Sequence, residues 1–100
     1  MISINSNKGM HFEFSNGNVI SIQIGYGNYC ENKENPQVYY GMQWDQIKSK
    51  DAEIAIFDSS GRWYDFENNK FKEDNTTDVK GYVPSDEVFE WIEKCRKGEL

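Results

Sequence analysis

The first quarter of the chain alternates hydrophobic and polar residues, which predicts a β-hairpin. Met10–Phe14 places its two phenylalanines on one face, and Val19–Ile24 does the same with its three isoleucines. This period of two is typical of half-buried strands. The Asn16-Gly17 pair between the two runs favours a type I′ turn, which requires a positive φ at both central positions. A shorter run, Ile2–Asn5, predicts one further strand ahead of this hairpin.

Three more short strands are predicted in the second half of the chain. They are Ala52–Phe57, Arg62–Phe66 and Val79–Val83. The turn between the first two, Asp58–Gly61, has the composition of an Asx or type I turn that ends on a left-handed glycine. Before the last strand, residues 68–78 are polar and charged, which predicts a mobile loop.

A single amphipathic helix is predicted at the end of the chain. Ser85 is a suitable N-cap, and Gly98 is a suitable stop. The residues at helical spacing that form its apolar stripe are Val88, Trp91, Ile92 and Cys95. We therefore expect residues 1–100 to form a single α+β domain, in which one antiparallel β-sheet built from hairpins is packed by one C-terminal amphipathic helix.

Composition and charge narrow the possible function classes. The chain has 100 residues, with 17 Asp and Glu against 11 Lys and Arg, and a net charge of −6 at pH 7. Direct nucleic-acid binding is disfavoured, because it needs a basic face that displaces counterions. A polybasic membrane-surface module is disfavoured for the same reason. The sequence has no apolar run of the length of a membrane span or a signal peptide, so a cytoplasmic location is expected.

Few residues offer catalytic chemistry. His11 is the only histidine, and the two cysteines, Cys30 and Cys95, lie far apart without a metal-type spacing. Neither cysteine has the neighbouring basic charge that activates a thiol. The paired carboxylates do not match the spacing of a calcium-binding loop. We therefore expect a protein that is not an enzyme and that holds no cofactor or metal.

The segment from Gly25 to Lys50 has no regular period but is rich in rings and amides. Flat rings, amide edges and cations together suit a nucleotide-sized ligand, and the backbone N–H groups of Gly25–Asn28 are a candidate phosphate cradle. Arg62 and Trp63 are expected to face the same opening. The predicted ligand-binding residues are Tyr26, Gly27, Asn28, Tyr29, Asn32, Lys33, Trp44, Arg62 and Trp63. The alternative is that the rings pack under the segment as a satellite of the core.

Three blocks of the sequence resemble a family of small uncharacterised proteins of tailed bacteriophages. The most specific block, G-x-G-N-Y-C-x-N at residues 25–32, follows the hairpin run 14–24. The second block is Ala52–Asp58 with Gly61 and Trp63, and the third is Gly81–Val83 leading into Asp86–Val88. The resemblance implies a phage protein in the cytoplasm of an infected bacterium. One class of phage proteins, the Thoeris anti-defence sponges, sequesters ADP-ribose-type signals without destroying them.

Two functions are compatible with these features. The first is a non-catalytic anti-defence sponge for immune evasion, which binds and sequesters a nucleotide-derived immune signal of the ADP-ribose or cyclic nucleotide type. The alternative is an acidic protein-binding inhibitor of a host defence or nucleic-acid enzyme. A homo-oligomer would supplement the small core of a domain of this size. A hydrolase is least favoured because the catalytic inventory is thin.

Overall fold

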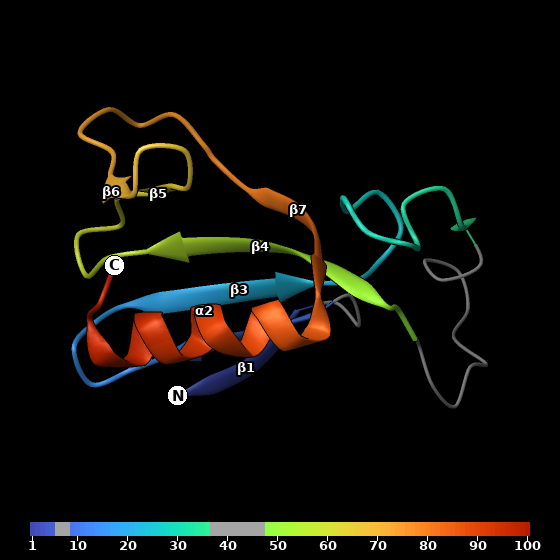
Figure 1. Ribbon diagram of the computed structural model, residues 1–100, viewed down its shortest axis with the longest axis horizontal. Coiled ribbons are helices and arrows are strands. Elements are labelled where there is room, and N and C mark those ends of the chain that lie inside the picture. The colour runs from blue at the N-terminus through green and yellow to red at the C-terminus, as the bar shows by residue number, and fades with distance from the viewer. Residues whose placement is uncertain (6–8, 37–47) are drawn as a thin grey trace.

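The computed structural model describes residues 1–5, 9–36 and 48–100. Its elements form a five-stranded antiparallel sheet, a separate two-stranded sheet and one helix (Figure 1). The strands are β1 (Ile2–Asn5), β2 (Gly9–Glu13), β3 (Val19–Gln23), β4 (Asp51–Phe57), β5 (Tyr64–Asp65), β6 (Lys70–Phe71) and β7 (Lys80–Pro84), and the helix is α2 (Ser85–Lys97). The α+β fold with a C-terminal helix packed on an antiparallel sheet is therefore confirmed.

The large sheet has the strand order β1-β2-β3-β4-β7, and its register gathers the isoleucines on one face. Ile20 of β3 lies opposite Ile56 of β4, and Ile22 lies opposite Ile54. Because side chains alternate along a strand, these residues point to the same side of the sheet. Helix α2 packs on that side over β3, β4 and β7, so the isoleucines of β4 are fully buried (Figure 1).

Helix α2 uses the predicted apolar stripe but begins differently from the prediction. Val88 and Cys95 are buried against the sheet. Ser85 is the first helical residue rather than the cap, and the N-cap position is held by Pro84 without a side-chain hydrogen bond. At the other end Gly98 has a φ of 72°, and the N–H of Glu99 donates to the carbonyl of Lys94 at 2.9 Å. This is the Schellman ending that a left-handed glycine allows.

The β2–β3 hairpin is confirmed, but its predicted type I′ turn is wrong. Within Ser15–Asn18, Gly17 alone has a positive φ, of 87°. The N–H of Gly17 donates to the carbonyl of Phe14 at 2.9 Å, and the N–H of Phe14 donates to the carbonyl of Asn18 at 2.9 Å. These bonds define a three-residue loop with a type I turn and a left-handed glycine. The side-chain amide of Asn16 instead donates to backbone carbonyls at the end of α2.

The predicted strand Arg62–Phe66 is also corrected. Only β5 is formed there, and it pairs with β6 inside the segment expected to be a loop, outside the large sheet. The cause is a cluster of rings around buried Tyr64. Its ring meets those of Phe66, Phe71 and Trp91 edge-to-face at 5.2, 5.4 and 5.9 Å. Burying these rings against α2 draws the chain away from the sheet after a single bridge between Phe57 and Trp63.

Candidate ligand-binding site

The segment after β3 folds into a closed series of turns rather than an open loop. The N–H of Gly27 donates to the carbonyl of Lys33 at 3.0 Å, and the N–H of Lys33 donates to the carbonyl of Cys30 at 3.0 Å. The side chain of Asn28 turns back to accept the N–H of Gly25 at 3.0 Å. Glycine at position 27 suits this path, because its φ is 85°. The predicted site residues between 26 and 33 therefore lie in one unit closed by hydrogen bonds.

Two carboxylates of β4 anchor this unit to the sheet. Glu53 accepts the backbone N–H of Tyr29 at 2.8 Å and the side-chain amide of Asn28 at 3.3 Å. Asp51 accepts the N–H of Glu31 at 2.6 Å. In return, the Glu31 carboxylate accepts the N–H of Lys50 at 2.6 Å. These three acidic residues are thus structural acceptors for backbone donors.

Two of the amides expected to read a ligand, those of Asn28 and Asn32, are used inside the protein. Asn32 is buried, and its amide donates to the carbonyls of Ile24 at 2.8 Å and Lys48 at 2.9 Å. Asn28 is engaged as described above. Buried Cys30 donates its thiol to the carbonyl of Gly25 at 3.7 Å, and burial raises the pKa of this thiol. A protonated, enclosed thiol is a poor nucleophile.

Three of the backbone N–H groups expected to hold a phosphate at Gly25–Asn28 already donate hydrogen bonds within the protein. The N–H groups of Gly25 and Gly27 are bonded as described, and that of Asn28 donates to the carbonyl of Gly25 at 3.2 Å. A backbone donor already paired inside a turn gains little from a phosphate oxygen, because it would exchange one hydrogen bond for another. Any anion held at this site would have to meet side chains instead.

A bulge in β7 brings a tyrosine that the sequence analysis did not select. Ala52 lies opposite Val83 and Ile54 lies opposite Lys80, so Glu53 faces two residues of β7, Gly81 and Tyr82. Tyr82 has a φ of 54°, a left-handed conformation that is rare for an aromatic residue. Bulges of this kind re-aim side chains and are common beside functional sites. Here the bulge turns Tyr82 toward the 26–33 unit.

Tyr29 and Tyr82 together present an exposed aromatic face. Tyr29 is 48 % exposed and Tyr82 is 53 % exposed, and their ring centroids lie 6.5 Å apart at an angle of 60°. The ammonium of Lys33 lies 5.5 Å from the Tyr29 ring centroid. Tyrosine is enriched at binding interfaces, and neighbouring exposed rings are one mark of an interaction site. We call these three residues, Tyr29, Lys33 and Tyr82, the tyrosine face.

A hollow of about 420 Å³ adjoins the tyrosine face. Its lining residues are Cys30, Glu31, Lys33, Glu34, Lys50, Asp51 and Tyr82. Three carboxylates therefore stand against two lysines, although Glu31 and Asp51 already accept backbone N–H groups and Glu34 pairs with Lys33 at 3.2 Å. Hydrogen bonding to Glu34 raises the pKa of Lys33, so this lysine is charged at neutral pH. The electrostatic field at the hollow is mixed rather than strongly positive.

Arg62 and Trp63 do not join this face, which corrects the prediction that they share its opening. Strand β4 begins beside the 26–33 unit at Asp51 and ends at Phe57, whose ring meets that of Trp63 at 4.4 Å. Seven residues of strand span roughly 20 Å, so the two groups lie at opposite ends of the sheet. Figure 1 shows this separation, with β5 and β6 far from the segment that follows β3. Arg62 is bonded to Asp58 at 2.7 Å. Trp44 lies outside the described residues.

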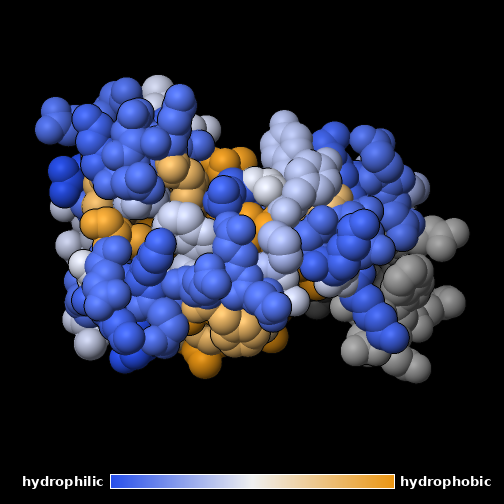
Figure 2. Space-filling view, viewed as in Figure 1, coloured by the Kyte–Doolittle hydropathy of each residue, from blue (hydrophilic) through white to orange (hydrophobic). Residues whose placement is uncertain are grey.

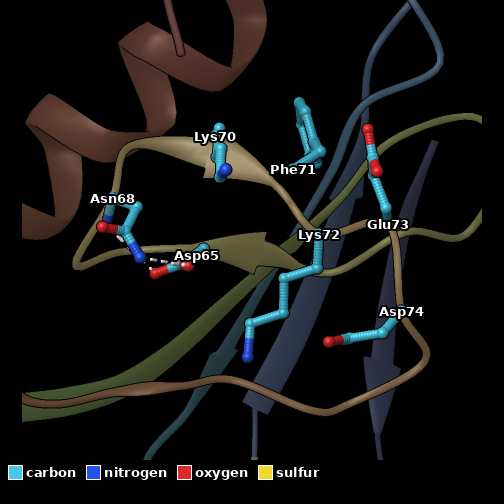
Figure 3. A pocket seen from close by; sticks show the side chains of 7 residues that line it. All are labelled: Asp65, Asn68, Lys70, Phe71, Lys72, Glu73 and Asp74. Carbon is cyan, nitrogen blue, oxygen red and sulfur yellow. Dashed lines mark hydrogen bonds between the residues drawn. The ribbon is translucent and has the colours of Figure 1, made fainter.

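A second hollow, of about 580 Å³, lies beside the β5–β6 hairpin (Figure 3). Its polar groups serve to close the local turns. Asp65 accepts the Asn68 amide at 2.8 Å, and Asp74 accepts the N–H of Thr76 at 3.0 Å. Lys72 donates to the Thr76 hydroxyl at 3.1 Å. Phe71 packs on Tyr64, so this hollow has no comparable free aromatic face and is the weaker candidate.

The comparisons add no relative from which a site could be transferred. The sequence matches no protein-family model, no curated protein and no solved structure. Within the described ranges, no three His, Cys, Asp or Glu residues are grouped as metal ligands. Among the same residues no helix is long and apolar enough to cross a membrane.

Proposed function

We propose that this chain is a non-catalytic binding protein whose tyrosine face holds the ring of a nucleotide-derived ligand. The observation that supports the proposal is the Tyr29–Tyr82 pair, held half-exposed at 6.5 Å by a β-bulge. Two tyrosines whose backbones are joined by a hydrogen bond offer planar contact area at a low entropic cost. The proposed role is that of a phage anti-defence protein, which sequesters a nucleotide-derived immune signal of the ADP-ribose or cyclic nucleotide type.

The charges around the hollow determine which part of such a ligand would bind most tightly. Three carboxylates beside two lysines disfavour a deeply held phosphate. Stacking of the base on Tyr29 or Tyr82 is therefore expected to supply most of the affinity, since a base–aromatic contact is worth about 1–3 kcal/mol. Lys33, which lies beside the Tyr29 ring, would pair with the ligand phosphate from the open side.

Thermal unfolding with a small panel of ligands tests the proposal. The panel is adenosine, ADP-ribose, a cyclic dinucleotide and, as a control without a base, ribose 5-phosphate. A ligand at 100 times its Kd adds about 2.7 kcal/mol, which for a domain of this size raises Tm by about 10 °C. We expect at least one base-containing ligand to raise Tm and ribose 5-phosphate to leave it unchanged. A flat response across the panel would overturn the proposal.

Matched variants locate the effect. Tyr29→Ala removes one exposed ring while its backbone hydrogen bonds remain, and it should abolish the shift. Phe89→Ala removes a ring that is 68 % exposed on α2 and belongs neither to the tyrosine face nor to the lining of the hollow beside it, so it should leave the shift intact. Lys33→Gln should weaken only the ligands that carry phosphate, whereas Lys97→Gln should change none of them.

The acidic protein-binding inhibitor has less support from the surface. Several acidic side chains are locally neutralised, as Glu93 is by Arg96 and Lys97 at 3.2 and 3.3 Å. Asp58 and Glu87 likewise have cationic partners. A surface that imitates nucleic-acid phosphates needs its charges unpaired and facing one way.

A further inference from the structure

Strand β1 lies at one end of the large sheet, with its outer edge unpaired among the described strands. Met1 and Glu13 exchange two backbone hydrogen bonds, at 2.7 and 2.8 Å. Antiparallel pairing alternates, so Ser3 and Asn5 also direct their backbone groups toward β2. The N–H and C=O groups of Ile2 and Ile4 therefore point outward. They form a template for one more strand.

The opposite edge of the sheet is protected in several ways, and β1 is not. Strand β7 carries Lys80, ends on Pro84 and contains the bulge at Tyr82. The Tyr82 N–H is already donated to the carbonyl of Tyr29 at 2.8 Å. Charge, proline, bulges and covering loops are the usual means of preventing edge pairing. The sequence of β1, Ile-Ser-Ile-Asn, has neither a charge nor a proline.

The apolar rows of the core also continue to β1, where no segment of residues 1–5, 9–36 or 48–100 buries them. One cross-strand row runs from Ile56 through Ile20 and Phe12 to Ile2. The parallel row runs from Ile54 through Ile22 and Met10 to Ile4. Ile56 and Ile54, which begin the two rows, are fully buried. At the other end of the rows, Ile2 is 66 % exposed and Ile4 is 71 % exposed. Figure 2 shows hydrophobic surface gathered at the lower margin of the molecule, in the part of the view where Figure 1 draws β1 and α2.

We propose that two copies of this chain pair through β1 in an antiparallel, two-fold arrangement that joins their sheets. Pairing Ile2 with the partner's Ile4 on both sides of the axis satisfies all four outward groups of each strand, and Ser3 then faces the partner's Ser3. The four isoleucines meet on the face that α2 covers further along the sheet. The strand is its own complement, because apolar side chains meet apolar ones and serine meets serine.

No charged side chain of β1 opposes a second copy at the contact itself. Each copy carries a net charge of −6, yet the contacting strand is neutral, so the repulsion between copies acts at long range and is screened by salt. A contact of a few residues on each side belongs to the small interface class, and we expect a Kd on the order of 100 µM. Raising the salt concentration should tighten the association.

Sedimentation velocity over a concentration series tests the dimer, and charge variants test its register. Ile2→Lys with Ile4→Lys in one chain places like charges opposite each other across the axis, and should raise the Kd at least about 100-fold. The same pair changed to glutamate should behave alike. Mixing the lysine and glutamate variants should restore a one-to-one heterodimer, because every Lys then faces a Glu. All four substitutions are at exposed positions, and unfolding curves at low concentration confirm that the monomers remain folded.

Phe89→Lys is the control, since it places the same charge on exposed apolar surface of α2. It should leave the dimer intact. The proposal is overturned by a monomer at all concentrations up to about 1 mM, well above the expected Kd. It is equally overturned if Phe89→Lys breaks the dimer while the β1 variants do not, or if the mixed charge variants fail to associate.

Discussion

The backbone N–H of Tyr82 donates to the backbone carbonyl of Tyr29 at 2.8 Å, which locks a bulge of β7 onto the turns that follow β3. This single bond joins segments more than fifty residues apart in the sequence and places their two rings on one face. It needs a close approach, because a Cβ added to Gly81 would lie 2.8 Å from the Cβ of Tyr29. The geometry of the tyrosine face therefore depends on the absence of a side chain at position 81.

Gly81→Ala is expected to destabilise the protein and to disturb the tyrosine face together. Its added methyl group forces the β7 bulge away from Tyr29, at a cost of about 1–3 kcal/mol. Urea unfolding measures the loss. Gly61→Ala is the control, because open space surrounds that position and its φ of 80° alone should cost about 1 kcal/mol. An alanine at position 81 that matches the wild type in stability and ligand binding would contradict this account.

Asn16 is expected to stabilise the end of α2 from across the fold. Its amide donates to the carbonyls of Cys95 at 3.0 Å and Arg96 at 3.1 Å. Asn16→Ala should cost about 1 kcal/mol in urea unfolding. Asn16→Asp should cost more, since a carboxylate cannot donate and repels the negative end of the helix dipole. Asn75→Asp makes the same charge change in an exposed loop and should be nearly neutral. Equal losses for the two Asn16 variants would argue against the dipole effect.

Both cysteines are expected to resist thiol reagents in the folded protein. Burial raises the pKa of the Cys95 thiol to about 12 and also raises that of Cys30. At pH 8 the thiolate fraction is therefore small, and neither sulfur is accessible. Labelling should be slow in buffer and rapid in denaturant, whereas an added surface thiol, from Ser60→Cys, should react at once. Fast native labelling of Cys30 would reopen the question of cysteine chemistry.

The ion pair of Asp58 and Arg62 is expected to make stability depend on pH in the acid range. Partial burial raises the pKa of the Asp58 carboxyl, but the hydrogen bonds from Arg62 and Ser60 outweigh it and the net pKa is lowered. The stabilisation is therefore complete above the ordinary aspartate pKa of about 3.9 and is lost as the pH falls through the lowered value.

Asp58→Asn removes this titration. We expect the variant to be less stable than the wild type at pH 7, by about 1 kcal/mol, and the gap to narrow as the pH falls below the ordinary aspartate pKa of about 3.9. Arg62→Gln should show a smaller gap that also narrows in acid, because it removes only the side-chain partner while the backbone N–H groups of Arg62 and Ser60 still bond Asp58. Urea unfolding at several pH values makes the comparison, and a gap that stays constant down to pH 2 would rule out the pair as its cause.

The layout of the fold follows from the sequence because it depends on local periods. The isoleucines at positions 20 and 22 alternate, and the helix stripe from Val88 to Cys95 repeats every three or four residues, so each predicts its own element. The β5 region was wrongly joined to the main sheet because Tyr64 is held by rings from distant parts of the chain. Because those rings come from other segments, the burial of Tyr64 produces no periodic pattern of hydrophobic residues in the sequence around it.

The candidate site was harder to predict, since an amide looks the same in a sequence whether it meets a ligand or a carbonyl. Asn32 was expected to read a base and instead binds the backbone of Ile24 and Lys48. Tyr82 was missed because its position depends on a bulge that only the packed sheet creates. The separation of Arg62 from Tyr29 could have been predicted from the sequence, because the two ends of a seven-residue strand lie far apart.

Native mass spectrometry with the same ligand panel tests the tyrosine face most directly. We predict one bound base-containing ligand per chain in the wild type and in Phe89→Ala, and no bound ligand in Tyr29→Ala. Tyr82→Gly should also lose the ligand while remaining folded, because glycine accepts the φ of 54° without strain. No adduct with any ligand, or the same adduct in all four proteins, would contradict the account.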